Sequence, residues 1–216
     1  MDKSDKYQLV KQDYGSIATW YDKTYDASKE MKRELDDFLS DFKPGQKILD
    51  AGCGPGKESI YLSQRCSVTA LDLSPEMLAI VKKNDPSIET LLGDINQLKF
   101  ENQSFDGIWS CRTIIHIPIE DLKHVFSEFH RVLKKNGVFG LISLNTTHGE
   151  DHEEQFLPEE DGADPAKKLT YYRNLYSEGF LTKVLEKASF KIIKSIVRSD
   201  TDNEPFIYIK AQNIIN

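Results

Sequence analysis

The chain has 216 residues, of which 39% are hydrophobic and 29% charged, and a formal net charge of −7 at neutral pH. This length fits one large domain with a substantial core, and the negative charge argues against nucleic acid as a partner, because phosphates would be repelled. No apolar stretch is long enough to cross a bilayer or to form the core of a signal peptide, so we expect a globular, cytoplasmic protein that does not bind membranes.

The first 44 residues form a polar, tyrosine-bearing segment that we expect to be a helical arm or lid. A helix is predicted over residues 28–42, because apolar side chains recur there at helical spacing, namely Met31, Leu35, Phe38, Leu39 and Phe42. Pro44 and Gly45 are expected to end this helix. The main domain is then expected to span residues 45–216.

Strands and helices alternate from residue 47 onward. The predicted strands cover residues 47–51, 67–72, 88–92, 105–110 and 138–144, and the predicted helices cover residues 58–64, 74–83 and 119–133. Ser74 and Pro75 form a helix start signal, whereas Asn136 and Gly137 are expected to stop the third of these helices. This alternation predicts an α/β fold with a doubly wound, mostly parallel sheet and helices on both faces.

The region after residue 144 breaks the alternation. Residues 145–165 contain eight acidic residues, no Lys or Arg, and no regular period. We expect residues 145–176 to be an acidic, lid-like insertion, and a merely solvated acidic loop is an equal alternative. A helix is predicted over residues 177–188, followed by strands over residues 191–197 and 206–211, whose short connection predicts a C-terminal antiparallel hairpin.

The segment K-I-L-D-A-G-C-G-P-G-K, residues 47–57, leads from the first strand into three alternating glycines, Gly52, Gly54 and Gly56. Glycine accepts positive φ and lets a ligand approach the backbone closely. Asp72 ends the second strand twenty residues after Gly52, where a carboxylate can accept hydrogen bonds from both hydroxyls of a ribose. The G-x-G-x-G spacing differs from the dinucleotide fingerprint G-x-G-x-x-G and from the phosphate loop, which disfavours a pyrophosphate ligand.

Five motifs follow one another along the chain: I-L-D-A-G-C-G-P-G-K-E, A-L-D-L-S-P-E-M-L, L-L-G-D-I, F-D-G-I-W-S and R-V-L-K-K-N-G-V-F. In this order they resemble the motif series of the class I S-adenosylmethionine-dependent methyltransferases, over about residues 46–144. The resemblance implies a seven-stranded sheet with a reversed last strand. It also implies S-adenosylmethionine as the cofactor and methyl transfer as the activity.

The resemblance further implies which residues hold the cofactor. The glycines would pass beneath its methionine part, and residues at the second and third strand ends would hold its ribose (Asp72) and its adenine (Leu73, Met77, Asp94 and Ile95). Ser110 and Cys111 would lie near the amino-acid part and the sulfonium. The complete set expected to bind the cofactor is Tyr21, Asp50, Ala51, Gly52, Cys53, Gly54, Gly56, Asp72, Leu73, Met77, Gly93, Asp94, Ile95, Ser110 and Cys111.

The N-terminal aromatic residues Tyr14, Trp20 and Tyr21 are candidates for closing over the cofactor, and simple aromatic packing under the arm is the alternative. Methyl transfer is an in-line displacement at an activated sulfonium, so the protein must chiefly align the acceptor and exclude water. If a general base is used, His116 is the candidate, because it follows the fourth strand and its imidazole suits proton transfer near neutral pH. A hydrogen-bonded structural role for His116 is the competing interpretation.

The cysteines Cys53, Cys66 and Cys111 lack C-x-x-C spacing. His148 and His152 are four residues apart, but a metal site there would need further ligands and a helix that the composition of this segment does not support, so no metal site is expected.

The acceptor is expected to be a small molecule, because the segment S-C-R-T-I-I-H-I-P lacks the [DNS]-P-P-[YF] motif of similar enzymes that methylate nucleobases. Tyrosines at positions 171, 172 and 176, together with Phe156, suggest an aromatic wall that would suit a cationic acceptor. Two other functions remain open at this point: a protein that binds S-adenosylmethionine without catalysis, and a nicotinamide-dependent oxidoreductase.

Overall fold

The computed structural model describes residues 3–24, 27–146, 151–156, 171–199 and 204–214. A seven-stranded sheet forms its centre, in the order β3-β2-β1-β4-β5-β9-β8. The strands are β1 Lys47–Ala51, β2 Ser67–Asp72, β3 Glu89–Leu92, β4 Phe105–Cys111, β5 Leu133–Leu144, β8 Phe190–Arg198 and β9 Phe206–Asn213. The first five are parallel to one another, whereas β9 is antiparallel to both β5 and β8. The predicted fold class and the C-terminal hairpin are therefore confirmed.

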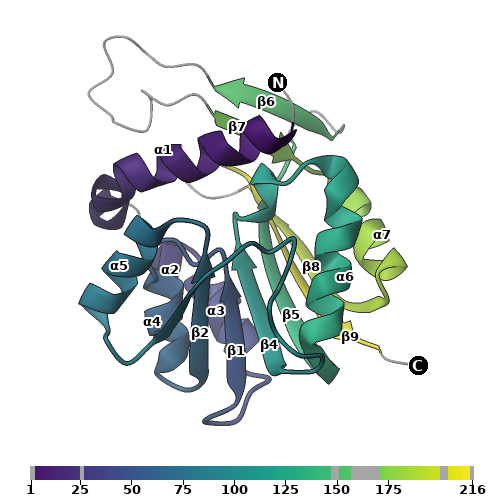
Figure 1. The fold of residues 1–216 in the computed structure, drawn as a ribbon. Coiled ribbons are helices and arrows are strands. Elements are labelled where there is room, and N and C mark those ends of the chain that lie inside the picture. Colours follow the sequence, from purple (N-terminus) through teal and green to yellow (C-terminus); the bar gives the residue numbers. More distant parts are fainter. Residues whose placement is uncertain (1–2, 25–26, 147–150, 157–170, 200–203, 215–216) are drawn as a thin grey trace.

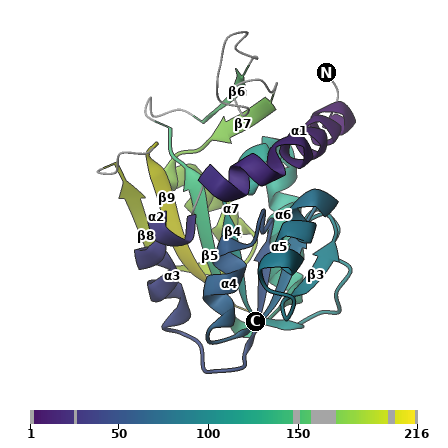
Figure 2. The same cartoon turned by 90° about the vertical axis from the view of Figure 1, so that its left-hand side faces the viewer.

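Helices cover both faces of the sheet (Figure 1). They are α1 Lys3–Thr24, α2 Ala27–Glu30, α3 Lys32–Leu39, α4 Lys57–Ser63, α5 Pro75–Asn84, α6 Leu122–Val132 and α7 Glu178–Lys187, with short 3-10 turns at Ile114–His116 and Ile119–Asp121. In Figure 2, α2, α3 and α4 lie in front of the sheet. Helices α6 and α7 pack against the opposite face through the larger apolar cluster.

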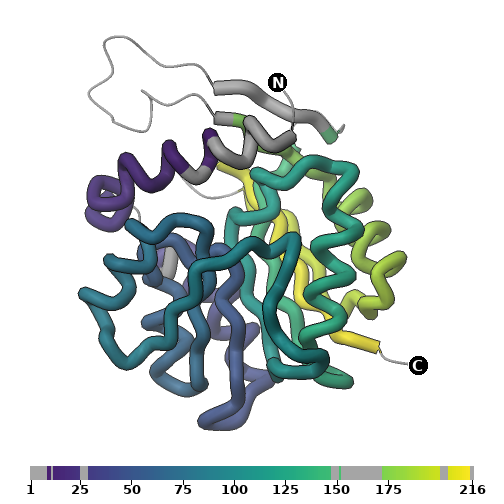
Figure 3. Tube along the Cα trace, in the orientation of Figure 1, coloured from purple at the N-terminus to yellow at the C-terminus, as the bar shows by residue number. Residues whose placement is uncertain are grey.

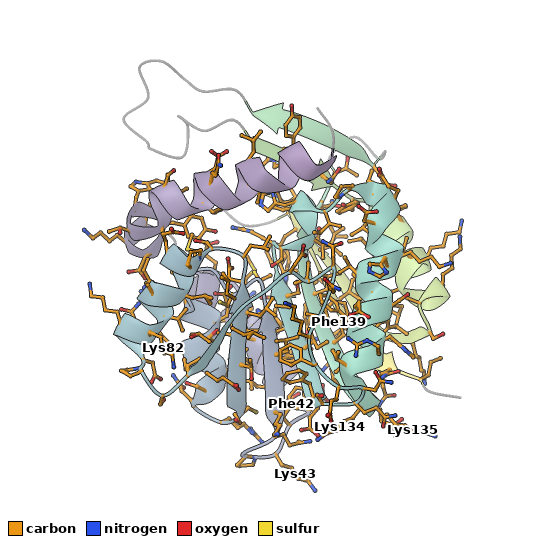
Figure 4. All side chains as sticks on the ribbon, in the orientation of Figure 1. Phe42, Lys43, Lys82, Lys134, Lys135 and Phe139 are labelled. Atoms are coloured by element: carbon orange, nitrogen blue, oxygen red, sulfur yellow. The ribbon has the colours of Figure 1, made fainter. Side chains whose placement is uncertain are left out.

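Side-chain alternation along the strands explains why the sheet has two cores. Ile48 and Leu49 are neighbours in β1 and both are fully buried, yet they belong to different apolar clusters, one with α3 and the other with α6. On the α6 face, Phe139 packs against the rings of Phe126 and Phe129 at centroid distances of 6.0 and 5.2 Å. Figure 4 shows Phe139 in the interior, whereas the labelled lysines lie at the rim.

Aromatic side chains of the α3 segment pack directly on the strand backbone. A Cβ at Gly107 of β4 would lie 2.4 Å from the ring of Phe42, and one at Gly140 of β5 would lie 2.8 Å from the ring of Phe38. Larger residues at these two positions would push the helix off the sheet. The glycines thus allow α3 to approach the centre of the sheet closely.

Several predicted boundaries are wrong. The helix expected over residues 28–42 is divided into α2 and α3 at Met31, which is a turn, and it ends at Leu39. Helix α6 covers Leu122–Val132 instead of residues 119–133, and Leu133 already pairs with Phe105 in the sheet. Asn136 has a φ of 63° and lies inside β5, where the register between β4 and β5 shifts.

The region between β5 and α7 contains structure that the sequence did not indicate. Strand β6 His152–Phe156 pairs with β7 Tyr171–Leu175 in a separate antiparallel sheet, so the acidic segment is not wholly irregular. Residues 147–150 and 157–170 lie outside the described ranges. Helix α1 lies within the helical arm expected over residues 1–44, although no helix was predicted there with bounds near residues 3–24. It contacts α5 and β7 along one edge of the sheet (Figure 3).

Candidate functional site

A cavity of about 310 Å³ lies at the carboxyl ends of β1, β2 and β4, beneath α1. This is the edge at which parallel α/β sheets bind ligands. The residues that line the cavity are Val10, Tyr14, Tyr21, Gly52, Gly54, Leu71, Asp72, Leu73, Ser74, Met77, Gly93, Ile95, Cys111, Arg112, Thr113, Ile115, His116, Ile117, Leu144, Arg173 and Glu204.

The glycine loop forms the floor of this cavity. Gly52, Gly54 and Gly56 have φ values of 79°, 52° and 83°, as the sequence predicted for a loop that needs positive φ. A Cβ at Gly52 would lie 2.2 Å from Oγ1 of Thr113, whereas a Cβ at Gly54 would meet no atom within 4 Å. Gly52 is therefore required by protein packing, and Gly54 leaves an open space that faces the cavity.

Asp72 is held beside Gly54 by the backbone. Its Oδ2 accepts a hydrogen bond from Gly54 N at 2.8 Å, and its Oδ1 accepts one from Ser74 N at 2.9 Å. Burial raises the pKa of Asp72 above its usual value. Since a carboxylate offers about four acceptor positions, Asp72 retains capacity for hydroxyl donors of a ligand.

Asp50, which was expected to bind the cofactor, lies behind the loop. It is 2% exposed, and its Oδ2 accepts a hydrogen bond from Ser59 Oγ at 2.5 Å. Burial and the nearby Glu58 raise the pKa of Asp50 well above its usual value. Asp50 thus connects the end of β1 to helix α4 and supports the loop from outside the cavity.

The two cysteines near the cavity are protonated thiols. Burial raises the pKa of Cys53 and of Cys111 well above the usual value. Because the thiolate is the nucleophilic form, neither residue is suited to covalent catalysis at neutral pH. Cys111 lines the cavity, and Cys53 does not.

His116 joins three segments that are distant in sequence. Its Nδ1 lies 3.0 Å from the backbone oxygen of Tyr172 and its Nε2 lies 3.0 Å from the hydroxyl of Tyr14. A carbonyl oxygen can only accept, so Nδ1 carries the proton and Nε2 accepts a hydrogen bond from Tyr14. Burial lowers the pKa of His116 to about 4, which makes the imidazole neutral at pH 7.

Four of the polar wall residues were missed by the sequence reasoning. Thr113 donates a hydrogen bond from Oγ1 to the backbone oxygen of Ala51 at 2.9 Å and so connects β4 to the glycine loop. Arg112 and Thr113 directly follow the fourth predicted strand, and that position was the signal that could have identified them. Arg173 and Glu204 form an ion pair at 2.5 Å, and no local pattern brings these two segments together.

Most residues expected at the cofactor site do line the cavity, and six do not. Those six are Asp50, Ala51, Cys53, Gly56, Asp94 and Ser110. Asp94 accepts hydrogen bonds at Oδ1 from the backbone and side-chain nitrogens of Asn96, both at 2.8 Å. Gly56 begins helix α4, and a Cβ there would lie 2.7 Å from Val81.

The aromatic residues expected to close over the cofactor or to line the acceptor pocket are only partly in place. Tyr14 and Tyr21 line the cavity, but Trp20 and Tyr172 do not. Tyr176 is fully buried, and its hydroxyl donates to the backbone oxygens of Ile117 and Ile114 at 3.2 and 3.4 Å, so it forms no cavity wall. The side chains of Phe156 and Tyr171 lie outside the described residues.

The described part of the chain contains neither a metal-binding cluster nor a membrane-spanning helix. No group of three or more His, Cys, Asp or Glu side chains there could hold a metal ion. No helix in those same ranges has the length and apolar character that crossing a membrane requires.

Comparison with known proteins agrees with the motif series. Residues 48–137 match a family model described as a methyltransferase domain. An uncharacterized methyltransferase from Synechocystis is 36% identical over 103 residues, which are 47% of this chain and 49% of that protein. A malonyl-[acyl-carrier protein] O-methyltransferase from Salmonella typhimurium is 35% identical over 126 residues, 52% of this chain and 49% of that protein. The chain spans about half the length of these relatives.

The fold also has solved counterparts. The crystal structure of a 1,6-didemethyltoxoflavin N1-methyltransferase from Burkholderia thailandensis, with its substrate and S-adenosylhomocysteine bound, superposes with a TM-score of 0.78 at 16% identity. The match covers 100% of this chain and 92% of that one. The comparisons agree with the resemblance seen in the motifs: residues 48–137 match a methyltransferase domain, and the whole chain has the same fold as this solved methyltransferase.

Proposed function

We propose that this protein is an S-adenosylmethionine-dependent methyltransferase that acts on a small-molecule acceptor. The observation that carries the proposal is the open space at Gly54, in a positive-φ loop that the carboxylate of Asp72 holds at 2.8 Å. A backbone without a side chain beside the partly buried carboxylate of Asp72 suits a nucleoside with a polar extension. The methyltransferase domain match and the shared fold support the same activity.

The residues present fit the cofactor in chemical character. Asp72 would accept hydrogen bonds from the ribose hydroxyls, and Gly52 and Gly54 would lie beneath the methionine part. Apolar side chains around the same cavity would hold the adenine, namely Leu71, Leu73, Met77 and Ile95. When bound, the cofactor supplies a methyl group activated by its sulfonium. Tyr21 and Cys111 complete the cofactor part of the cavity in this proposal.

We assign His116 the role of general base, assisted by Tyr14. The neutral Nε2 of His116 accepts a hydrogen bond from the Tyr14 hydroxyl. A methyl acceptor that donates a hydrogen bond to the Tyr14 oxygen would pass its proton to Tyr14 as Tyr14 passes its own proton to His116. Tyr172 orients the imidazole through its backbone oxygen. Replacing a purely structural His116 would lower the stability of the protein and leave the rate of methyl transfer unchanged, so the two roles can be distinguished.

The arm at residues 1–44 and the insertion at residues 145–176 are proposed to close the cavity. Helix α1 contributes Val10, Tyr14 and Tyr21 to the wall, and β7 contributes Arg173. The described parts of both segments, helix α1 and strand β7, therefore lie where they would exclude water from the transferred methyl group. A cytoplasmic location and the absence of nucleic-acid partners are further parts of this proposal, based on composition and charge.

Titration calorimetry with S-adenosylhomocysteine and, separately, with NADH tests the proposed cofactor. We expect binding of S-adenosylhomocysteine and none of NADH. Incubation with methyl-labelled S-adenosylmethionine and a panel of small acids, alcohols and amines then tests catalysis by the appearance of labelled product. Cofactor binding without any transfer across the panel would favour the non-catalytic alternative, and NADH binding alone would contradict the proposal.

A further inference from the structure

Strand β7 is attached to the end of the central sheet, above its carboxyl edge (Figure 1). Tyr176 directly follows this strand and pairs with the backbone after β5: Tyr176 N donates to Leu144 O at 3.3 Å, and Thr146 N donates to Tyr176 O at 3.1 Å. Leu175 also packs with Leu144 and Ile115 in one buried apolar cluster. The end of β7 therefore has a fixed position relative to the sheet.

Asn174 on β7 binds the backbone on both sides of His116. It is 3% exposed, and its Nδ2 donates to the backbone oxygen of Ile115 at 3.1 Å and to that of Ile117 at 2.9 Å. Both partners are carbonyl oxygens, which only accept, so the amide nitrogen of Asn174 and not its oxygen must face them. The two protons of one side-chain amide thus hold the residues immediately before and after His116.

The same strand also contacts the ring of His116. Nδ1 of His116 donates to the backbone oxygen of Tyr172, two positions before Asn174, at 3.0 Å. One strand therefore holds both the backbone around His116 and its imidazole ring. With Nδ1 held in this way, Nε2 faces the hydroxyl of Tyr14 at 3.0 Å, and both His116 and Tyr14 line the cavity.

Tyr176 makes a smaller contribution to the same turn. Its hydroxyl lies 3.2 Å from the backbone oxygen of Ile117 and 3.4 Å from that of Ile114, and its single proton can satisfy only one of them at a time. Asn174 has the shorter contacts and two protons. Asn174 is not one of the described wall residues, so it can act on the site only through the turn that it holds.

We infer that Asn174 is a positioning residue, which holds the His116 imidazole with its proton on Nδ1 and with the unprotonated Nε2 directed at Tyr14. A neutral imidazole in water exchanges between two tautomers, and a hydrogen bond to one ring nitrogen selects one of them. Without the Asn174 amide, the turn would separate from β7 and Nδ1 would lose the backbone oxygen of Tyr172. The importance of this arrangement for catalysis rests on the proposed function, in which Nε2 receives the proton.

The test is the tautomer of His116, observed through the nitrogen-15 chemical shifts of its ring at pH 7. The spectrum of His116→Gln identifies the signals of this residue among the five histidines. We expect wild type to populate only the form with the proton on Nδ1. Asn174→Leu, in which an apolar side chain of similar size replaces the amide, should populate both forms. Tyr176→Phe should keep the wild-type tautomer, because the Asn174 contacts remain.

Asn213 offers a matched control at the opposite edge of the sheet, beside the start of β5. It is also fully buried, and its Nδ2 donates to three backbone oxygens, those of His130, Leu133 and Lys134, at 3.0, 2.9 and 3.2 Å. Asn213→Leu should lower Tm, as Asn174→Leu does, and leave the tautomer of His116 unchanged. A change of tautomer in both variants would assign the effect to a general loss of stability and overturn the inference.

Methyl transfer provides a second measurement, with labelled S-adenosylmethionine and an acid, alcohol or amine that the wild type methylates. We expect kcat of Asn174→Leu to fall by about tenfold or more, because a displaced catalytic group loses alignment, and the Kd for S-adenosylhomocysteine to stay within twofold of wild type. A wild-type tautomer in Asn174→Leu would overturn the inference, as would an unchanged kcat in that variant when His116→Gln is impaired.

Failure of the proposed function gives a different result. A wild-type kcat in His116→Gln would contradict the role of His116 as base, and absence of any transfer by wild type would contradict catalysis. In both cases the tautomer of Asn174→Leu still decides whether Asn174 holds the ring. If Asn174→Leu does not fold, Asn174→Ser provides the same comparison, because one hydroxyl proton cannot hold both carbonyl oxygens and both tautomers are expected again.

Discussion

Replacing Gly54 with Ala tests whether the open space in the glycine loop is the place of a ligand. The φ of 52° would strain an alanine by about 1 kcal/mol, which corresponds to about 2 to 4 °C in Tm for a chain of this size. The new Cβ would meet no protein atom within 4 Å, so no steric clash within the free protein should add to this strain. Free Gly54→Ala protein should thus be only slightly destabilised.

The effect on the cofactor should be much larger. If the cofactor lies over Gly54, the added methyl group occupies its space, and overpacking of a tight contact costs about 1 to 3 kcal/mol. Titration calorimetry should then show S-adenosylhomocysteine binding weakened by about 5- to 150-fold.

Gly45 offers a matched control for this experiment. Its φ is 80°, and a Cβ there also meets no atom within 4 Å. Gly45 is exposed in the loop before β1, at the opposite end of that strand from the cavity. Gly45→Ala should lower Tm by a similar amount and leave cofactor affinity unchanged. If Gly54→Ala binds S-adenosylhomocysteine within twofold of wild type, the cofactor does not pass over Gly54 and the site must be reassigned.

Three further variants extend these tests. Asp72→Asn should weaken S-adenosylhomocysteine binding by about 1 to 3 kcal/mol, because the ribose hydroxyls lose a charged acceptor; unchanged affinity in calorimetry would remove Asp72 from this role. His116 has its pKa lowered from 6.5 to about 4, so it contributes stability that is present above pH 6.5 and is lost as the pH falls toward 4. The free energy of unfolding, measured by urea denaturation, should therefore fall less between pH 7 and pH 4.5 in His116→Gln than in wild type. An equal fall in both proteins would contradict this assignment. Phe38→Ala should reduce the free energy of unfolding by about 3 to 5 kcal/mol, because the ring is fully buried, whereas the half-exposed Ile193→Ala should change it by at most about 0.5 kcal/mol.

The five motifs predicted the fold because each depends on residues close together in the chain. Apolar runs such as residues 47–51 identified the parallel strands, and the capping pair Ser74 and Pro75 located the start of α5, where Ser74 Oγ accepts a hydrogen bond from Met77 N at 3.2 Å. The role expected of Asn136 and Gly137 was wrong for a tertiary reason: Leu133 pairs with Phe105, so the chain has already entered β5 before it reaches these two residues.

The candidate site shows the same division between local and distant determinants. By itself, the sequence determined the glycine loop and Asp72, because their spacing along one β-α-β unit is a local property. Only the tertiary structure decided that Tyr14 meets His116, 102 positions away, and that Arg173, Glu204 and Arg112 line the same cavity. Such contacts depend on how α1, β7 and the β8–β9 connection fold over the sheet edge, and no periodicity or motif in one segment encodes its distant partner.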